Sequence, residues 1–171
     1  MSLFNIKELR LRKKFDKILS DKKEIFTDKE IKSIGIISLS TISESLKLEE
    51  EIASILGVKN IKIYSFCKDS KLKEDSFQYF SKKDINSKGN FINPNLQSFL
   101  EEPFDLLIGY FKEDNLYLKM AILQSRASFK VGFTGVDENL YRIEISEKTE
   151  NLKSFSLELK KYLQLFKKLK N

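Results

Sequence analysis

The stretch that decides the fold is "FDLLIGYFKEDNLYLKMAILQSRASFKVGF", residues 104–133. Residues 104–110 form a short apolar run, which is typical of a strand covered on both faces of a sheet. Residues 115–125 follow with the length and composition of a helix, and residues 129–133 form a second apolar run. This order predicts two parallel strands joined by a right-handed helical crossover.

A second unit of the same kind precedes it. The runs "SIGIISL" (33–39) and "IKIYSF" (61–66) predict two further strands. Between them, "TISE" predicts a capping box in which Thr41 caps the helix and Glu44 reaches back to it. Gly57 predicts the end of that helix, since glycine readily adopts the left-handed conformation.

The remaining segments carry weaker signals. Residues 68–89 are polar and rich in lysine, which predicts a long loop with a small hairpin or extended piece. Asn93 followed by Pro94 predicts a helix start, because proline at the first helical position has no amide to leave unpaired. Residues 140–145 predict a fifth strand.

Both ends of the chain predict basic amphipathic helices. In residues 3–20 the apolar face comprises Phe4, Leu11, Phe15 and Ile18, and the basic face comprises Lys7, Arg10, Lys13, Lys14 and Lys17. In residues 150–169 the expected inward side chains are Phe155, Leu159, Tyr162, Leu163 and Phe166. The expected outward side chains there are Lys153, Lys160, Lys161, Lys167, Lys168 and, just beyond, Lys170.

Alternating strands and helices of these lengths predict an α/β protein. We expect residues 1–171 to form a single three-layer, Rossmann-like domain around a mostly parallel sheet of four or five strands. Within it, residues 1–22 form the basic N-terminal helix, residues 32–147 the α/β core and residues 148–171 the basic C-terminal helix. Nothing in the interior has the composition of a linker, and no internal repeat is present.

Composition narrows the class of protein. An apolar content of 41% is enough to bury a core. No apolar run approaches the roughly 20 residues that cross a bilayer, the first residues lack the features of a signal peptide, and Cys67 is the only cysteine. We therefore expect a cytoplasmic protein that does not bind membranes and whose lone cysteine is partly buried and inert.

Charge favours a polyanionic partner. The net charge is +6 and the isoelectric point about 9.2. A coding bias toward lysine would produce the same excess, but the positive charge concentrates in the two terminal helices. Clustering of this kind predicts a surface for phosphates, although solvated lysines on helix faces are an equally ordinary explanation.

Common catalytic residue patterns are missing. The chain has no histidine, which removes the most frequent general base and the Ser-His and Cys-His pairs. It contains neither a G-x-G-x-x-G motif nor a G-x-x-x-x-G-K-[ST] motif. We expect no metal, no cofactor and no catalysis.

Two loops stand where open parallel sheets bind ligands, beyond the carboxyl ends of strands. The first carries Ser38, Ser40 and Thr41, and the second carries Asp114 and Asn115. These residues are the alternative site, a cleft for a nucleotide or sugar phosphate. The competing interpretation is that the hydroxyls fill a turn and that Asp114 caps a helix.

The stretch from Glu102, "EPFDLLIGYFKEDNLYLKMAILQSRASFKVGFTG", resembles a small uncharacterised bacterial family of basic α/β proteins. It also resembles a lineage-specific large-subunit ribosomal protein, which implies a role on ribosomal RNA. A weaker similarity is to the N-terminal domain of heptosyltransferase-like glycosyltransferases, in which a strand opening on aspartate is followed by a helix and a "K-VGF" strand. Those enzymes bind the nucleotide sugar in a second domain, so the resemblance implies a half-scaffold without transferase activity.

Three functions follow as hypotheses. The first is a non-catalytic module that binds structured RNA, ribosomal RNA above all, beside ribosomal proteins; no motif specific for DNA is present. Its predicted contact residues are Lys7, Arg10, Arg12, Lys13, Lys14, Lys17, Lys160, Lys161, Lys167 and Lys168. The second is a small enzyme or ligand-binding domain that uses the alternative cleft. The third is protein docking through "FQYF" (77–80), whose rings equally well cover a sheet edge.

Overall fold

The computed structural model describes residues 3–24, 27–69 and 78–170, with the side chains of residues 3–5 left out. The helices are α1 (Leu3–Asp21), α2 (Ser40–Ser45), α3 (Leu48–Leu56), the 3-10 turn η1 (Lys82–Asp84), α4 (Pro94–Glu101), α5 (Leu116–Gln124) and α6 (Leu152–Leu165). The strands are β1 (Ser33–Leu39), β2 (Asn60–Phe66), β3 (Tyr79–Phe80), β4 (Leu106–Tyr110), β5 (Lys130–Phe133) and β6 (Ile143–Ile145).

The strands form one sheet in the order β3-β2-β1-β4-β5-β6, and every pairing in it is parallel. This is the order of doubly wound dinucleotide-binding sheets, in which the winding direction reverses between β1 and β4. The predicted Rossmann-like α/β class is therefore confirmed. The predicted count of four or five strands is wrong, because β3 has only two residues and is too short for a periodic sequence signal.

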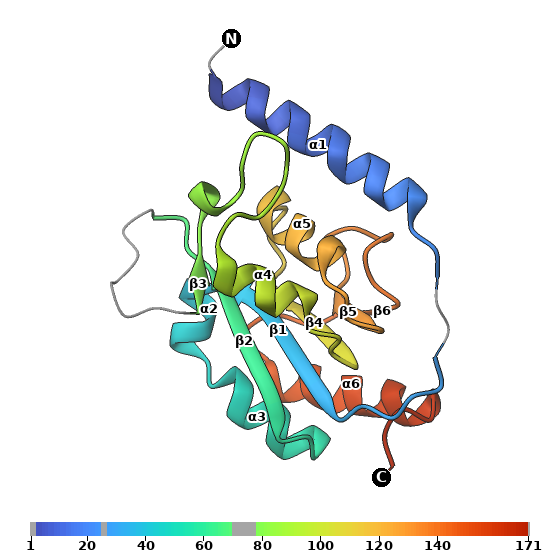
Figure 1. The fold of residues 1–171 in the computed structure, drawn as a ribbon. Helices are drawn as coiled ribbons and strands as arrows, with labels where there is room; N and C mark the ends of the chain where they lie inside the picture. Colours follow the sequence, from blue (N-terminus) through green and yellow to red (C-terminus); the bar gives the residue numbers. More distant parts are fainter. Residues whose placement is uncertain (1–2, 25–26, 70–77, 171) are drawn as a thin grey trace.

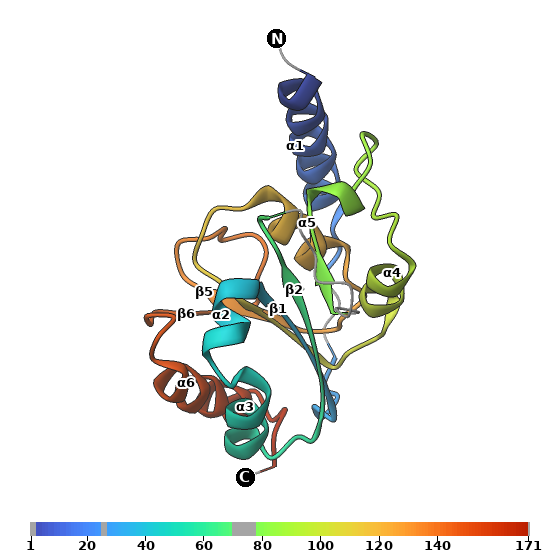
Figure 2. The same cartoon turned by 90° about the vertical axis from the view of Figure 1, so that its left-hand side faces the viewer.

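Helices cover both faces of the sheet (Figures 1 and 2). On one face α6 packs beside α3, and Phe155 of α6 contacts Tyr110 and Phe133 with ring centroids 4.9 and 4.6 Å apart. On the other face lie α4 and α5, and α1 packs across the outside of α5. The two predicted basic helices thus lie on opposite sides of the molecule.

The local starts and ends of several helices differ from the predictions. One helix was expected after β1, but α2 and α3 are separate and Leu46 between them is extended. The predicted capping box at Thr41 is wrong, since α2 begins at Ser40 with no side-chain cap. Gly57 does end α3 with φ 71°, and Asn93 caps α4 with Pro94 following, both as predicted.

The closing helix is shorter than predicted and ends at Leu165. Lys167 has φ 57°, and the amides of Lys167 and Lys168 donate to the carbonyls of Gln164 and Leu163 at 3.0 and 2.8 Å. These two hydrogen bonds form a Schellman turn, normally completed by glycine. The turn reverses the side chains that follow, so Phe166 is 50% exposed and Lys168 only 5% exposed, opposite to the prediction for both.

The predicted fifth strand over residues 140–145 is confirmed only for Ile143–Ile145. Tyr141 precedes the strand and its ring lies against the sheet, where Gly109 and Gly132 leave room for it. A Cβ built on Gly132 would lie 2.3 Å from that ring, so neither glycine can carry a side chain without moving Tyr141.

A buried carboxylate at the amino end of β4 joins three parts of the chain. Asp105 accepts hydrogen bonds from the amides of Lys32 and Ser33 at 3.0 and 3.1 Å and from the Ser33 hydroxyl at 3.1 Å. Its other oxygen lies 2.7 Å from the ammonium of Lys29. Burial raises the pKa of Asp105, but the Lys29 and backbone hydrogen bonds outweigh it and leave the pKa lowered.

The segment 81–90 links α1 to the body of the protein. The Lys7 ammonium donates to the carbonyl of Lys82 at 2.9 Å, and the Lys14 ammonium donates to the side chain of Asn90. Gly89 lies beneath the Lys14 stem, and its carbonyl accepts from the Gln124 amide of α5 at 3.0 Å. The segment therefore holds α1 and α5 together.

We predict that Asp105→Asn lowers the free energy of unfolding by about 2 kcal/mol at pH 7, because an acceptor of charge-assisted hydrogen bonds is lost. A carboxylate with a lowered folded pKa stabilises the fold in full above its unfolded value near 3.9, and this contribution disappears as the pH falls through the folded pKa. Urea unfolding of both proteins from pH 7 to pH 3 measures it. A difference that stays constant over this range would contradict the assignment.

We predict that Gly89→Ala destabilises the protein more than Gly57→Ala. Both glycines have positive φ, 80° and 71°, so both substitutions carry a backbone cost of about 1 kcal/mol. Only at position 89 does the new Cβ meet a neighbour, the Lys14 stem at 2.5 Å, whereas nothing lies within 4 Å at position 57. Hydrogen exchange should show faster opening of α1 in Gly89→Ala alone, and equal exchange in both variants would show that segment 81–90 does not hold α1.

Candidate nucleic-acid interface

The exposed face of α1 carries a row of cationic side chains. Arg10, Lys13 and Lys17 recur at helical spacing, are exposed, and span about 10 Å along the helix axis. Within the part of the chain that the structure describes, these three side chains make no hydrogen bond or ion pair. The packing of Leu11 and Phe15 inward, 0% and 5% exposed, fixes which way this row faces.

The other predicted residues of α1 divide into two groups. Arg12 is exposed, and its charge helps to lower the pKa of Asp114, after the larger effect of the Lys119 hydrogen bond. Lys7 and Lys14 are half-buried and already donate to segment 81–90. We name Arg10, Lys13 and Lys17 the α1 stripe.

Segment 81–90 extends the basic surface beyond α1. It carries the exposed residues Lys82, Lys83 and Lys88, together with one acidic residue of its own, Asp84. The Asp84 carboxylate accepts from the amide of Ser81 at 2.8 Å and from the side chain of Asn93 at 3.2 Å, so it caps η1. Nothing in the spacing of the sequence identified this segment as part of the same surface.

The lysines of α6 have different surroundings. Lys161 is exposed but pairs with Glu158 at 3.4 Å, and Lys160 is half-buried. The neighbouring helix α3 begins with Glu49, Glu50 and Glu51, so acidic groups flank this face.

The two predicted lysines at the end of the chain, Lys167 and Lys168, differ in exposure. Lys167 is exposed beyond the helix. Lys168 is buried; its ammonium donates to the carbonyl of Thr27 at 2.5 Å and lies 4.8 Å from the centre of the Phe129 ring. The expectation of an outward Lys168 is therefore wrong, and its cause is the Schellman turn that ends α6.

At the carboxyl ends of β1 and β4, two residues of the alternative cleft, Ser38 and Asn115, make hydrogen bonds within the protein. Ser38 is 0% exposed and donates to the carbonyl of Tyr110 at 2.8 Å, and Ser40 is buried while Thr41 is exposed. Asn115, in place of the expected Asp114, caps α5 by accepting from the amides of Tyr117 and Leu118 at 3.0 and 3.1 Å.

Two ion pairs lie at the crest of the sheet, the edge formed by the carboxyl ends of β1 and β4. The Asp114 carboxylate lies 2.8 Å from the ammonium of Lys119, and Lys68 bridges from the end of β2 to Glu113 at 2.5 Å. Among the described residues no group of three or more acidic or cysteine side chains could hold a metal ion. These two ion pairs, the Ser38 hydrogen bond and the Asn115 cap therefore hold loops and helix ends.

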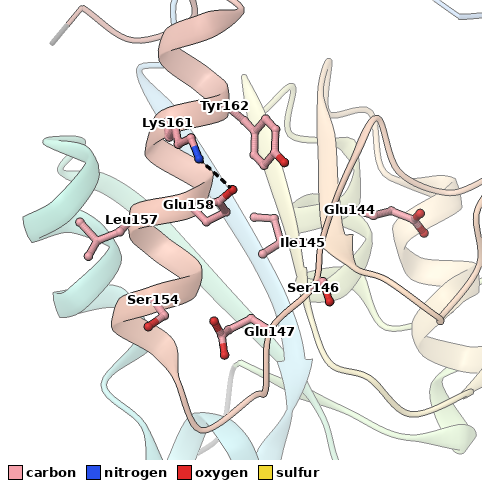
Figure 3. Close-up of a pocket in the computed structure, with 9 residues that line it drawn as sticks. All are labelled: Glu144, Ile145, Ser146, Glu147, Ser154, Leu157, Glu158, Lys161 and Tyr162. Carbon is pink, nitrogen blue, oxygen red and sulfur yellow. Dashed lines mark hydrogen bonds and ion pairs between the residues drawn. The ribbon is translucent and has the colours of Figure 1, made fainter.

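A hollow of about 550 Å³ lies elsewhere, between the edge strand β6 and α6 (Figure 3). Ile145 and Tyr162 contribute apolar surface, while Glu147 and the Glu158–Lys161 pair contribute charge. The Glu144 side chain points away from α6, and its Oε1 is buried without a hydrogen-bond partner among the described residues. The hollow has no arrangement of donor, base and nucleophile that indicates a reaction.

The segment "FQYF" offers no exposed aromatic patch in its described part. Phe77 lies outside the described residues, and Tyr79 is half-buried. Phe80 is 0% exposed and packs against Tyr64, Phe66 and Phe91 with ring centroids 6.1, 5.2 and 6.0 Å apart. Phe80 therefore covers the β2 edge of the core.

Cys67 is half-buried just after β2 and is a free thiol. None of the described helices combines the length and the apolar character that crossing a bilayer requires.

Comparison with known proteins places the chain in a family and supplies no named relative. No curated protein matched it, and no solved structure matched it. A family model described as a family of unknown function (DUF6913) matches residues 7–166, which includes α1 from Lys7, the whole sheet and α6. The chain is therefore a member of the family of unknown function DUF6913.

Proposed function

We propose that this protein is a non-catalytic module that binds structured RNA through the α1 stripe and the adjoining segment 81–90. The observation that carries the proposal is the set of exposed cations at Arg10, Lys13 and Lys17, which the described residues leave without an anionic partner. Neutralising phosphates releases condensed counterions, which is the main source of affinity for a polyanion.

The shape of the surface favours a phosphate backbone over base edges. Helix α1, which carries the α1 stripe, is straight and packs across α5 on the outside of the molecule (Figure 1). Two rows of cations, one on α1 and one on segment 81–90, would follow neighbouring stretches of backbone. No exposed aromatic ring lies in the stripe to stack on a base, so recognition would depend on RNA shape and charge.

In this proposal the lysines of α6 contribute less to RNA binding than the α1 stripe does. The two helices lie on opposite faces of the sheet, so one RNA duplex cannot contact both outer faces without wrapping around the domain. Acidic side chains of α3 also weaken the field around α6.

The finer form of the proposal places the protein on ribosomal RNA of the large subunit. Support comes from the sequence resemblance and from the basic surface, since ribosomal RNA presents phosphates at high density. Ligand binding at the β1/β4 crest is a second candidate, favoured by the strand order, which reverses there. The engagement of Ser38 and Asn115 in structural hydrogen bonds weighs against it.

We predict that Arg10→Gln, Lys13→Gln and Lys17→Gln together weaken binding to a structured RNA by at least about tenfold at 0.1 M salt. The slope of log affinity against log salt should fall by about 2–3, because each lost phosphate contact removes roughly 0.7–0.9 from it. Fluorescence polarisation with a labelled RNA hairpin across a salt series measures both quantities.

The matched control is Lys59→Gln, Lys153→Gln and Lys161→Gln, which removes the same charge from exposed positions on the α3 and α6 side. Near wild-type affinity and slope are expected for it. Equal losses in both triple variants would mean that RNA responds only to net charge, and the α1 interface would have to be abandoned.

We also predict that the tagged protein sediments with the large ribosomal subunit in a sucrose gradient at low salt and leaves it at high salt. The α1 triple variant should shift to the top of the gradient while the α6-side control stays with the subunit. Wild-type protein found only at the top would contradict the ribosomal form of the proposal and leave binding to other RNAs to be tested by polarisation.

A further inference from the structure

The outer surface formed by α3 and α6 carries opposite charges on its two helices. These helices pack side by side on one face of the sheet (Figure 2). Helix α3 begins with three consecutive acidic residues, of which Glu49 and Glu50 are exposed. On α6 the exposed cations are Lys153 and Lys161, and Lys160 is half-buried. One half of this surface is therefore acidic and the other half basic.

A large apolar side chain lies between the two exposed lysines of α6. Leu157 is 50% exposed and stands one helical turn from both Lys153 and Lys161, so the three side chains project from the same side of the helix. Figure 3 shows Leu157 on the side of α6 that is nearer to α3. We name Glu49, Glu50, Lys153, Leu157 and Lys161 the α3/α6 face.

Ion pairs within each helix use little of this charge. The Lys161 ammonium lies 3.4 Å from the Glu158 carboxylate, and the Lys47 ammonium lies 3.3 Å from the Glu50 carboxylate. Both pairs join residues three positions apart on a helix surface, and exposed pairs of this kind are weak. Their side chains can therefore turn toward an approaching molecule at little cost.

A surface with one acidic and one basic half is complementary to itself after a two-fold rotation. If the axis runs along the line between α3 and α6, α3 of one molecule lies against α6 of the other at two equivalent places. Each acidic helix start then meets lysines, and Leu157 of both molecules lies close to the axis. The α1 stripe lacks this property, because its cations all have the same sign and two copies of it would repel each other.

We propose that the α3/α6 face binds a second copy of this chain and forms a symmetric homodimer. An identical copy satisfies the acidic and the basic half with one and the same surface, which is the reason for choosing it over an unrelated partner. The α1 stripe lies on the opposite side of the sheet and stays open in this dimer. Dimerisation requires no RNA, and the RNA binding proposed above requires no dimer.

The size of the face sets the expected strength of the dimer. Helix α6 has 14 residues and is about 20 Å long, and two helices side by side are about 20 Å wide. Such a face buries less than the roughly 800 Å² per partner of a standard interface, so we expect a dissociation constant on the order of 10 μM. Salt should weaken the dimer, because it screens the exposed charges.

Sedimentation equilibrium of the full chain tests for the dimer directly. The average mass should rise from the monomer value of 20.0 kDa toward twice that value as the protein concentration passes through the dissociation constant, and high salt should reverse the rise. A mass that stays at the monomer value up to about twenty times the expected dissociation constant would overturn the proposal.

Reversing the charge of one helix at a time tests which helices meet. The pair Glu49→Lys and Glu50→Lys makes both halves of the face basic, and the pair Lys153→Glu and Lys161→Glu makes both halves acidic. Each double variant alone should be monomeric where the wild type dimerises, because like charges now face each other. An equimolar mixture of the two should form a heterodimer, since opposite charges meet again at both places.

The mixture also separates a lost interface from a lost fold, because a misfolded variant would not associate with the other one. Circular dichroism of each double variant supplies the same check. Two folded variants that fail to associate when mixed would overturn the proposed pairing. An undiminished dimer in the α3 variant would overturn it as well, because α6 would then be pairing with α6.

Leu157→Gln tests the apolar centre of the face. The matched control is Ile92→Gln, since Ile92 is 53% exposed and lies just before α4 on the other side of the sheet. Leu157→Gln should raise the dissociation constant of the dimer by roughly fivefold, because half of a leucine side chain is no longer removed from water, and Ile92→Gln should not change it. Equal effects of the two substitutions would place the contact elsewhere and overturn the proposal.

The dimer and the RNA interface fail independently. The α1 triple variant should dimerise like the wild type, and RNA polarisation at protein concentrations well below the dissociation constant of the dimer reports on the monomer alone. A monomeric protein that still binds RNA through α1 would overturn only the dimer. A dimer that responds to the α3/α6 variants but binds no RNA would support the dimer and overturn the RNA proposal.

Discussion

The architecture depends on the carboxylate of Asp105. This one side chain accepts hydrogen bonds from the backbone at the start of β1, which sets the register of β1 against β4 at the place where the sheet reverses its winding. It also pairs with Lys29, which anchors the segment that crosses from α1 to the sheet. The turn after α6 meets the same segment, where the amide of Ile31 donates to the carbonyl of Lys168 at 2.9 Å. The segment before β1 and the turn after α6 are therefore held close to one buried charge. A buried charge must be paired in this way because its desolvation is otherwise costly.

The sheet acts as a partition between two surfaces of different electrostatic character. On the α1 side, helix α5 is almost wholly buried and needs a cover, and α1 supplies it with Leu11 and Phe15 while its other side stays in solvent. On the α6 side, lysines stand next to the glutamates of α3. Terminal helices of similar composition thus have different capacities to attract a polyanion, because the field at a surface is the sum over all nearby charges.

At the crest of the sheet, residues in a position that often binds ligands make structural interactions instead. Doubly wound sheets bind ligands at the reversal of strand order, and here that position contains a serine bonded to the neighbouring strand, an asparagine that caps α5 and the ion pair between Lys68 and Glu113. No glycine-rich turn opens the backbone at this point. Exposed cations also lie on α1 and on segment 81–90, on the outer side of the helical layer.

By itself, the sequence determined the fold class, the parallel direction of the main strands, the start of one helix at Asn93 and the end of another at Gly57. These features depend on local periodicity and on residues with strong backbone preferences. It also placed Arg10, Lys13 and Lys17 on one face of α1, since helical spacing alone decides that. Only the tertiary structure decided that β3 joins the sheet, that Lys168 turns inward while Phe166 turns outward, and that α6 packs beside the acidic helix α3. Each of these depends on contacts between residues far apart in the chain or on a turn without its usual glycine, and neither leaves a pattern that spacing can reveal.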